Sequence, residues 1–202
     1  MMLNRTTAIL LLTGVIYFTC SCSPKNISTR YYYQNEKVLD GIESTYKDLY
    51  RRAPFKIAFT DRSFNTVSVE IITDSLTYIY DFIVKEPRLA DTLTRYHLNA
   101  SRITGLIREM QSIRCTWIST VDYYTDGKRD SLIFMSIKPV ALKAPFSYSK
   151  YYVLTYFHKP QYFDSEGRLL DKRQVRRLRK INGEVFRRIN DKVCYTISGR
   201  FR

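Results

Sequence analysis

Hydrophobic residues follow two different spacings along the sequence, one typical of helices and one typical of strands. Apolar side chains recur every three or four positions over residues 36–52, 87–96 and 99–113, and this spacing predicts three helices. Pro54 ends the first of them, because the residue before a proline is disfavoured in the helical conformation. Pro87 suits the first position of the second helix, where its missing N–H has no partner to lose.

Alternation of apolar and polar positions predicts a sheet. The alternating runs are short and are bounded by turn residues such as Asp126-Gly127, an arrangement that is typical of antiparallel hairpins. The expected strands cover residues 55–59, 67–71, 76–82, 115–124, 131–138, 148–158 and 192–200. We therefore expect an α+β domain in which one antiparallel, twisted sheet of six or seven strands carries helices on one side.

A helix followed by three strands occurs twice in this pattern, over residues 36–83 and 99–158. The two units have no matching residue identities, so an internal duplication is a hypothesis that rests on the order of the elements alone. The hypothesis predicts that both units have the same strand order, and a different order would reject it.

A fourth helix is predicted over residues 171–189, where basic residues are most concentrated. Asp171 and Gln174 have the spacing of a capping box at its start, and an apolar stripe follows at helical spacing. The basic side chains on its other sides are Lys172, Arg173, Arg176, Arg177, Arg179 and Lys180. Two interpretations remain open: a docking face for anionic lipid, acidic glycan or an acidic protein, or a solvated helix face that balances Asp and Glu elsewhere.

The first 22 residues have the pattern of an export signal. Arg5 precedes an apolar block over residues 8–18, which has about half the length of a membrane span. The block ends in Thr19-Cys20-Ser21-Cys22. With small residues and a cysteine at its exit, the segment resembles the signal peptide of a bacterial lipoprotein. An ordinary cleaved signal, which gives a soluble periplasmic protein, is the alternative.

The lipoprotein resemblance implies that a lipid-modified cysteine begins the mature protein. Cys22, which follows Ser21, is the expected acceptor, and Cys20 is the second choice. The family carries a diacylglyceryl group and an N-acyl chain such as palmitate, and several acyl chains together anchor a protein stably in a lipid bilayer. Ser23 stands where an aspartate would resemble the inner-membrane retention signal, which implies an outer-membrane lipoprotein that faces the periplasm.

The composition indicates a folded, cationic domain. Residues 23–35 are expected to form a polar tether, and residues 36–202 a single domain that buries roughly 70% of its unfolded surface. The whole chain has 45% hydrophobic residues and a net charge of +14, from 33 Lys+Arg against 19 Asp+Glu. This imbalance favours anionic partners, and the expected periplasmic location disfavours nucleic acid among them.

Cys115 and Cys194 are the two cysteines of the expected mature domain, and both fall in strand-like stretches. An oxidising compartment permits one disulfide between them. Two separately buried thiols, packed as small apolar residues, are the alternative. The sequence does not decide between the disulfide and the two buried thiols.

The sequence has no short motif of a common catalytic or metal site. His97 and His158 have no ligand-spaced partner, and no phosphate-binding glycine loop occurs, so we expect no metal or cofactor. Asp122, Asp126 and Asp130 surround the expected hairpin, where turn formation explains them more simply than acid–base chemistry. We expect a non-enzymatic binding or assembly lipoprotein with a basic surface. The alternative is a periplasmic hydrolase that acts on cell-wall or polysaccharide material through carboxylates such as those of Asp122 and Asp126.

Overall fold

The computed structural model of the chain describes residues 23–125, 128–139, 150–171 and 177–199. The helices in these residues are α2 (Pro24–Arg52), α3 (Pro87–Arg95) and α4 (Ala100–Ser112). The strands are β1 (Phe55–Phe59), β2 (Thr66–Ile72), β3 (Thr77–Ile83), β4 (Trp117–Thr125), β5 (Lys128–Pro139), β6 (Tyr151–Tyr156), β7 (Lys180–Ile181), β8 (Glu184–Val185), β9 (Arg187–Arg188) and β10 (Val193–Ser198). None of the described helices is long and apolar enough to cross a membrane.

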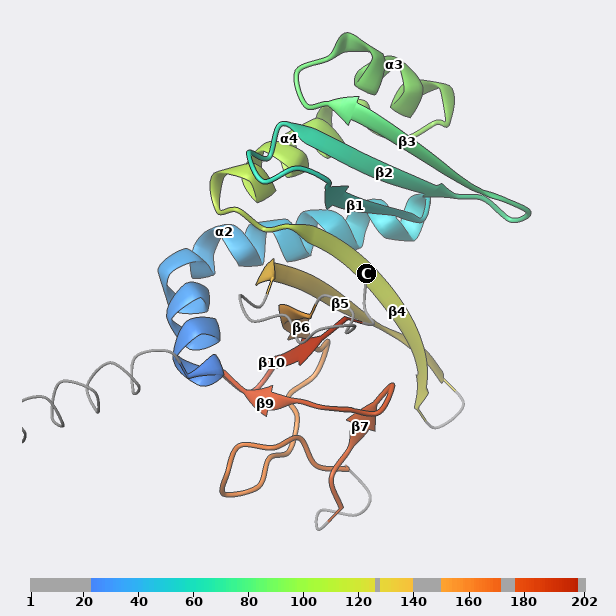
Figure 1. Cartoon of the computed structure of the whole chain (residues 1–202). Coiled ribbons are helices and arrows are strands. Elements are labelled where there is room, and N and C mark those ends of the chain that lie inside the picture. Colours follow the sequence, from blue (N-terminus) through green and yellow to red (C-terminus); the bar gives the residue numbers. More distant parts are fainter. Residues whose placement is uncertain (1–22, 126–127, 140–149, 172–176, 200–202) are drawn as a thin grey trace, which may run out of the picture.

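Eight of these strands form one antiparallel sheet in the order β3-β2-β1-β4-β5-β6-β10-β9, while β7 and β8 form a separate ribbon (Figure 1). The predicted α+β class and the antiparallel sheet are confirmed. The sheet has eight strands instead of six or seven, because the two-residue strand β9 pairs with β10 at one edge. A strand of two residues is too short for an alternating pattern to reveal it.

Helix α2 begins at Pro24, so the expected tether over residues 23–35 is wrong. The side chain of Ser23 caps the helix by accepting a hydrogen bond from the backbone N–H of Asn26 at 3.2 Å. Tyr32 is buried in the core beneath this first part of the helix. The pattern of aliphatic residues did not predict these turns, because tyrosines supply much of their apolar contact.

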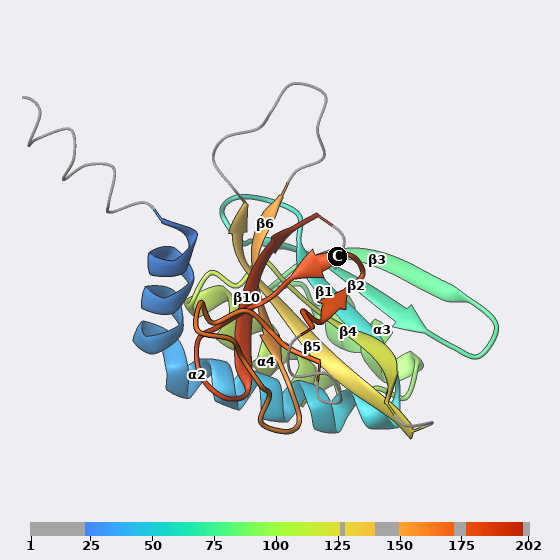
Figure 2. The same ribbon diagram turned by 90° about the horizontal axis from the view of Figure 1, so that it is seen from below.

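The two faces of the sheet are covered by different structures. All three helices pack on one face, where Leu39 of α2, Leu93 of α3 and Ile107 of α4 are fully buried. Leu169 and Phe186, from the chain between β6 and β10, are buried on the other face. Figure 2 shows that α2 extends across the strands and changes direction part-way along its length.

The two helix-plus-strand units have the same strand order. Counted outwards from the seam between β1 and β4, the first unit runs β1-β2-β3 and the second β4-β5-β6. The two strands at the seam are antiparallel, with Ile57 opposite Ile118. This arrangement is the one that a local two-fold axis through the seam produces. The duplication hypothesis therefore passes the test of strand order and stays a hypothesis.

Residues 177–189 form short strands, and the predicted helix is wrong there. The turn between β7 and β8 is Asn182-Gly183, whose φ angles are +50° and +82°. A type I′ hairpin turn requires positive φ at both of its central residues, and Asn-Gly is a preferred sequence for it. This turn interrupts the helical spacing, and Phe186 beyond it is buried against the sheet. Residues 172–176 lie outside the described part of the chain.

Cys115 and Cys194 are free, buried thiols, so the possible disulfide between them is not formed. Cys115 belongs to the core on the helical face and Cys194 to the core on the other face, and the sheet therefore separates them. Burial raises the pKa of Cys115 to about 12 and also raises the pKa of Cys194. Both thiols therefore stay protonated, and a protonated thiol is a poor nucleophile.

Candidate functional site

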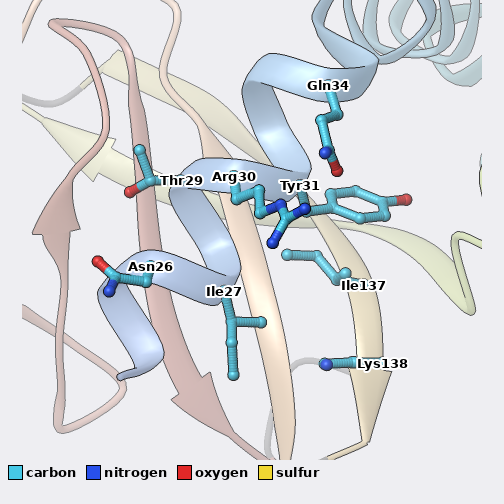
Figure 3. A pocket seen from close by; sticks show the side chains of 8 residues that line it. All are labelled: Asn26, Ile27, Thr29, Arg30, Tyr31, Gln34, Ile137 and Lys138. Atoms are coloured by element: carbon cyan, nitrogen blue, oxygen red, sulfur yellow. The ribbon is translucent and has the colours of Figure 1, made fainter. Parts of the chain in front are cut away.

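Two adjoining hollows lie at the end of the sheet where β1 and β5 end and where β4 and β6 begin. They share the side chains of Tyr31, Ile137 and Lys138, and their volumes are about 680 and 620 Å³. Figure 3 shows the first hollow, in which side chains from the N-terminal turns of α2 face the end of β5. We call the two hollows together the basic groove.

The rim of the basic groove is cationic. Its lining includes one carboxylate, that of Asp61, and four exposed cations, Arg30, Arg62, Arg114 and Lys138. Among the described residues, no acidic side chain lies within ion-pair distance of these four cations. The groove therefore offers a net positive charge to a ligand.

The single carboxylate of the groove is used inside the turn between β1 and β2. Asp61 accepts a hydrogen bond from the hydroxyl of Ser63 and others from the backbone N–H groups of Asn65, at 3.0 Å, and Thr66, at 2.8 Å. The bond from Ser63, followed by that from Thr66, lowers the pKa of Asp61. The negative charge therefore orders the turn, which carries Arg62 on the rim.

The floor of the groove is aromatic. The rings of Phe59 and Phe64 lie 4.8 Å apart, and those of Trp117 and Tyr151 meet edge to face at 6.4 Å. The guanidinium of Arg114 lies 5.4 Å from the centre of the Phe64 ring, so cation and floor are in contact. The Trp117 Nε1–H is buried and has no hydrogen-bond partner among the described residues. The floor thus presents apolar surface beside the cations of the rim.

Hydrogen bonds hold the walls of the groove together. The hydroxyl of Tyr31 donates to the backbone carbonyl of Ile113 at 2.9 Å, which ties α2 to the connection between α4 and β4. Burial raises the pKa of Tyr31, so this hydroxyl stays protonated and keeps its role as donor. The Nε2 group of Gln111 donates to the carbonyl of Phe64 at 2.7 Å, which ties α4 to the β1–β2 turn. The groove is therefore formed before any ligand arrives.

The described members of the predicted basic cluster do not line the groove. Arg177 and Lys180 are exposed near the β7–β8 ribbon. Arg179 is partly buried, because its guanidinium donates to Gln161 Oε1 at 3.0 Å and lies 5.9 Å from the ring centre of Phe157. The members that lie outside the described residues are Lys172, Arg173 and Arg176. Sequence reasoning missed the four groove cations because they come from four segments that are far apart in the chain.

The aspartates considered for catalysis belong to the hairpin of β4 and β5, whereas the two histidines lie elsewhere in the fold. Asp122 is exposed on β4, Asp130 lies on β5, and Asp126 falls outside the described residues. His97 lies in the turn after α3, and His158 follows β6. In the part of the chain that the structure describes, no group of three His, Cys, Asp or Glu side chains could hold a metal ion.

A separate hollow of about 690 Å³ lies beside a different stripe of α2, between this helix and the turn that leads into β10. Its carboxylates on α2 are those of Glu36, Asp40 and Glu43. Burial, followed by the negative charge of Glu36, raises the pKa of Asp40. We call this hollow the acidic pocket. The sequence shows these three acids at helical spacing, and this spacing is the signal that could have predicted the pocket.

The predicted lipidation residues, Cys22 and Cys20, lie outside the described residues. No family model matches the chain, and no curated protein and no solved structure matches it.

Proposed function

We propose that this protein is a non-catalytic binding lipoprotein of the cell envelope, and that its basic groove binds an anionic amphiphile. Such a ligand has a phosphate or carboxylate head and an apolar body. The proposal is carried by the combination of four cations that lack a described acidic partner with an aromatic floor. Arginine and lysine bind phosphate and carboxylate groups by charge-assisted hydrogen bonds, and an apolar floor accommodates the body of the ligand.

The position of the groove relative to the expected lipid anchor supports the proposal. Lipidated Cys22 would directly precede Ser23, the residue that caps α2. A helix rises 1.5 Å per residue, which puts Arg30 about 10 Å along the helix from Ser23. The groove would then lie close to the bilayer, where each basic side chain gains about 1 kcal/mol from anionic lipid. The head group of an anionic phospholipid is accordingly the favoured ligand.

An acidic protein or an acidic glycan would use the cations of the groove but not its floor. A polyanion of this kind needs charge on the rim, whereas the ring pairs Phe59–Phe64 and Trp117–Tyr151 supply apolar surface behind it. The proposal therefore predicts that the apolar body of the ligand contributes to binding. Equal affinity for a head group alone would favour the polyanion instead.

Trp117 makes the test direct, because it is the one tryptophan of the chain and lies on the floor of the groove. We expect its fluorescence to change saturably when decyl phosphate is added to full-length protein in a neutral maltoside detergent. Inorganic phosphate should cause a much smaller change, because it lacks the apolar body. An equal response to both ligands would contradict the proposal.

Two matched variants distinguish binding in the groove from non-specific attraction to the net positive charge of the protein. Replacing Arg30, Arg62, Arg114 and Lys138 by Gln should weaken decyl phosphate binding at least tenfold, since one charge-assisted hydrogen bond is worth about 1.5–3 kcal/mol. The control variant removes four exposed cations that do not line the groove, namely Lys37, Arg51, Arg95 and Arg108. Similar losses of affinity in both variants would show that net charge, and not the groove, binds the ligand.

The anchor has its own test. We expect a labelled fatty acid to be incorporated into the wild-type protein and not into Cys22→Ala. Incorporation that Cys22→Ala retains and Cys20→Ala loses would move the anchor to Cys20. The absence of label from the wild type would reject the lipoprotein assignment and leave the groove chemistry to stand alone.

The alternative, a carboxylate-dependent hydrolase of cell-wall or polysaccharide material, is favoured by one observation. Asp40 and Glu36 line the same pocket, and the pKa of Asp40 is raised, as a general acid requires. These residues differ from Asp122 and Asp126, which the sequence suggested. Release of soluble fragments from cell-wall material by the wild type, and its loss in Asp40→Asn, would support the hydrolase over the binding module.

A further inference from the structure

We propose that the basic groove binds a ligand with two phosphate groups that are joined by an apolar linker. Arg62 and Arg114 bind one phosphate, and Arg30 and Lys138 bind the other. This inference rests on the proposed function, because it concerns the same groove. It specifies the class of ligand further, as an anionic amphiphile with two charged heads instead of one.

The four cations of the groove are divided between its two hollows. Arg30 lines the first hollow and not the second, whereas Arg62 and Arg114 line the second and not the first. Lys138 lies at the boundary and lines both. Each hollow therefore has cations of its own, and a ligand that fills the whole groove meets positive charge at two places.

The order of the strands sets the distance between these two places. Arg62 lies in the turn that follows β1, and Lys138 lies near the end of β5. Strand β4 separates β1 from β5. Neighbouring strands are about 4.8 Å apart, so the ends of β1 and β5 are about 10 Å apart. A charged hydrogen bond to phosphate spans only about 2.8 Å, so two phosphates fit this spacing better than one.

The cations of the second hollow are held at their place. The guanidinium of Arg114 donates to the backbone carbonyl of Arg62 at 3.2 Å and lies 5.4 Å from the centre of the Phe64 ring. These contacts attach Arg114 to the turn that carries Arg62. A guanidinium has five N–H donors, so Arg114 keeps donors for a phosphate after this bond is made.

The backbone of Arg114 is unfavourable for an arginine. Its N–H bonds to the carbonyl of Gln111 at 3.1 Å, and the N–H of Cys115 bonds to the carbonyl of Met110 at 2.9 Å. This is the Schellman pattern at the end of α4, in which glycine is preferred because φ is positive. Arg114 has φ of +57°, and Phe64, which it contacts, has φ of +61°. Strained backbone of this kind is concentrated at functional sites, and here both residues line the second hollow.

The cations of the first hollow come from a helix and a bulged strand. The register of β5 against β6 shifts between Ser136 and Lys138, which makes Ile137 the extra residue of a β-bulge. The bulge places Lys138 opposite Tyr152, and the ammonium lies 5.7 Å from the centre of that ring. Figure 3 shows Lys138 in the same hollow as Arg30 of α2. These two cations form the second phosphate site.

The side chains between the two sites suit an apolar linker. Apart from Lys138, the hollows share Tyr31 and Ile137. The hydroxyl of Tyr31 already donates to the carbonyl of Ile113 at 2.9 Å. Neither shared side chain therefore asks for a polar group, and the aromatic floor of the second hollow continues the apolar surface.

The test is a titration of the full-length protein in a neutral maltoside detergent, followed by the fluorescence of Trp117. Hexamethylene bisphosphate has two phosphates at about the spacing of the two sites. Hexyl phosphate has the same carbon chain with one phosphate, and ethylene bisphosphate has two phosphates on a short linker. We expect hexamethylene bisphosphate to bind at least tenfold more tightly than either control ligand.

Variants assign the two phosphates to the named residues. Arg30→Gln should weaken the binding of hexamethylene bisphosphate at least tenfold and that of hexyl phosphate much less, because the single phosphate lies beside the aromatic floor, at Arg62 and Arg114. Arg114→Gly should weaken both ligands at least tenfold, and it keeps the fold because glycine suits the left-handed backbone. Arg95→Gln removes an exposed cation outside the groove and should change neither affinity.

The outcomes separate this inference from the proposed function. Equal affinities for hexamethylene bisphosphate and hexyl phosphate would overturn the inference and leave the proposed function standing, since one head and the apolar body would still bind. Equal losses in Arg30→Gln and Arg95→Gln would also overturn it, because general charge would then explain the gain. The absence of saturable binding by any of these ligands would reject both.

Discussion

The basic groove and the acidic pocket lie on different stripes of helix α2, and they are built in opposite ways. The groove places cations at the rim of an aromatic floor, and its one carboxylate is bound to its own turn. The pocket places two acids against a network of tyrosine and asparagine hydrogen bonds. Tyr31 faces the groove and Tyr32 the pocket, so adjacent positions of one helix serve two different chemistries.

The comparison shows that net charge describes this protein poorly. A chain with a charge of +14 suggests a uniformly basic surface. Among the described residues, the structure instead gathers four cations without an acidic partner at the groove and two acids without a cationic partner at the pocket, while other unpaired charges lie elsewhere on the surface. The two hollows should therefore prefer ligands of opposite sign.

The largest expected effect comes from reversing charge in one hollow at a time. Arg30→Glu with Arg114→Glu should weaken decyl phosphate binding by about 100-fold or more, because each reversal replaces an attraction of about 1 kcal/mol by a repulsion of similar size. The same variant should bind n-butylammonium, a cationic probe of the acidic pocket, as the wild type does. Fluorescence of Trp117 and the NMR shifts of the backbone amides near Asn190 report the two affinities, and parallel changes in both would contradict the contrast.

The next effect concerns the wall of the acidic pocket. Asn190→Ala removes one hydrogen bond to Tyr32 and two from the backbone of the turn before β10. We expect a loss of about 1–3 kcal/mol of unfolding free energy, since partners that are partly buried lose their hydrogen bonds. Urea denaturation measures it. A variant of full stability would show that the turn does not depend on this side chain.

A smaller effect of opposite sign is expected at Tyr156. Replacing this residue by phenylalanine removes a buried hydroxyl that has no described partner, so the unfolding free energy should rise by about 1 kcal/mol. Urea denaturation measures the change, and a destabilised variant would show that the hydroxyl has a structural role.

The smallest effect is the pH dependence contributed by Asp40. Its pKa is raised in the folded protein, so between pH 3.8 and the folded pKa the native state binds more protons than the unfolded state. The contribution of Asp40 to stability is therefore lost as the pH rises through this window. Asp48 and Asp61, whose pKa values are lowered, act in the opposite direction.

Asp40→Asn isolates this contribution. The difference in unfolding free energy between the variant and the wild type should shift in favour of the variant as the pH increases above 3.8. Urea denaturation at several pH values measures the difference. A constant difference over the whole range would show that Asp40 titrates as it does in the unfolded chain.

The sequence predicted the parts of the fold that depend on local pattern. Strands β1, β2 and β3 alternate clearly. The inward side chains of β1 and β2 are buried, and on β3 Phe82 is buried while Tyr78 and Tyr80 are partly buried. Helix α3 begins at Pro87 as expected. These elements follow from neighbours in the chain, so periodicity was sufficient to find them.

Prediction from the sequence failed where contacts between residues far apart in the chain, or the geometry of a turn, determine the structure. The first turns of α2 are held by tyrosines such as Tyr31, whose partner Ile113 is 82 positions away. The predicted helix over residues 171–189 is interrupted by Asn182-Gly183, a turn signal that helical spacing around it concealed. The groove could not be predicted at all, because its cations meet only when the sheet is assembled.

One measurement tests the opposition of the two hollows most directly. A single ¹⁵N-labelled, full-length sample is titrated first with decyl phosphate and then with n-butylammonium chloride, and the shifted amides are compared. The account predicts two separate sets, one around Arg62 and Arg114 for the phosphate and one from Asn190 to Val193 for the amine. Overlapping sets, or an anionic ligand that shifts no amide of the groove, would contradict it.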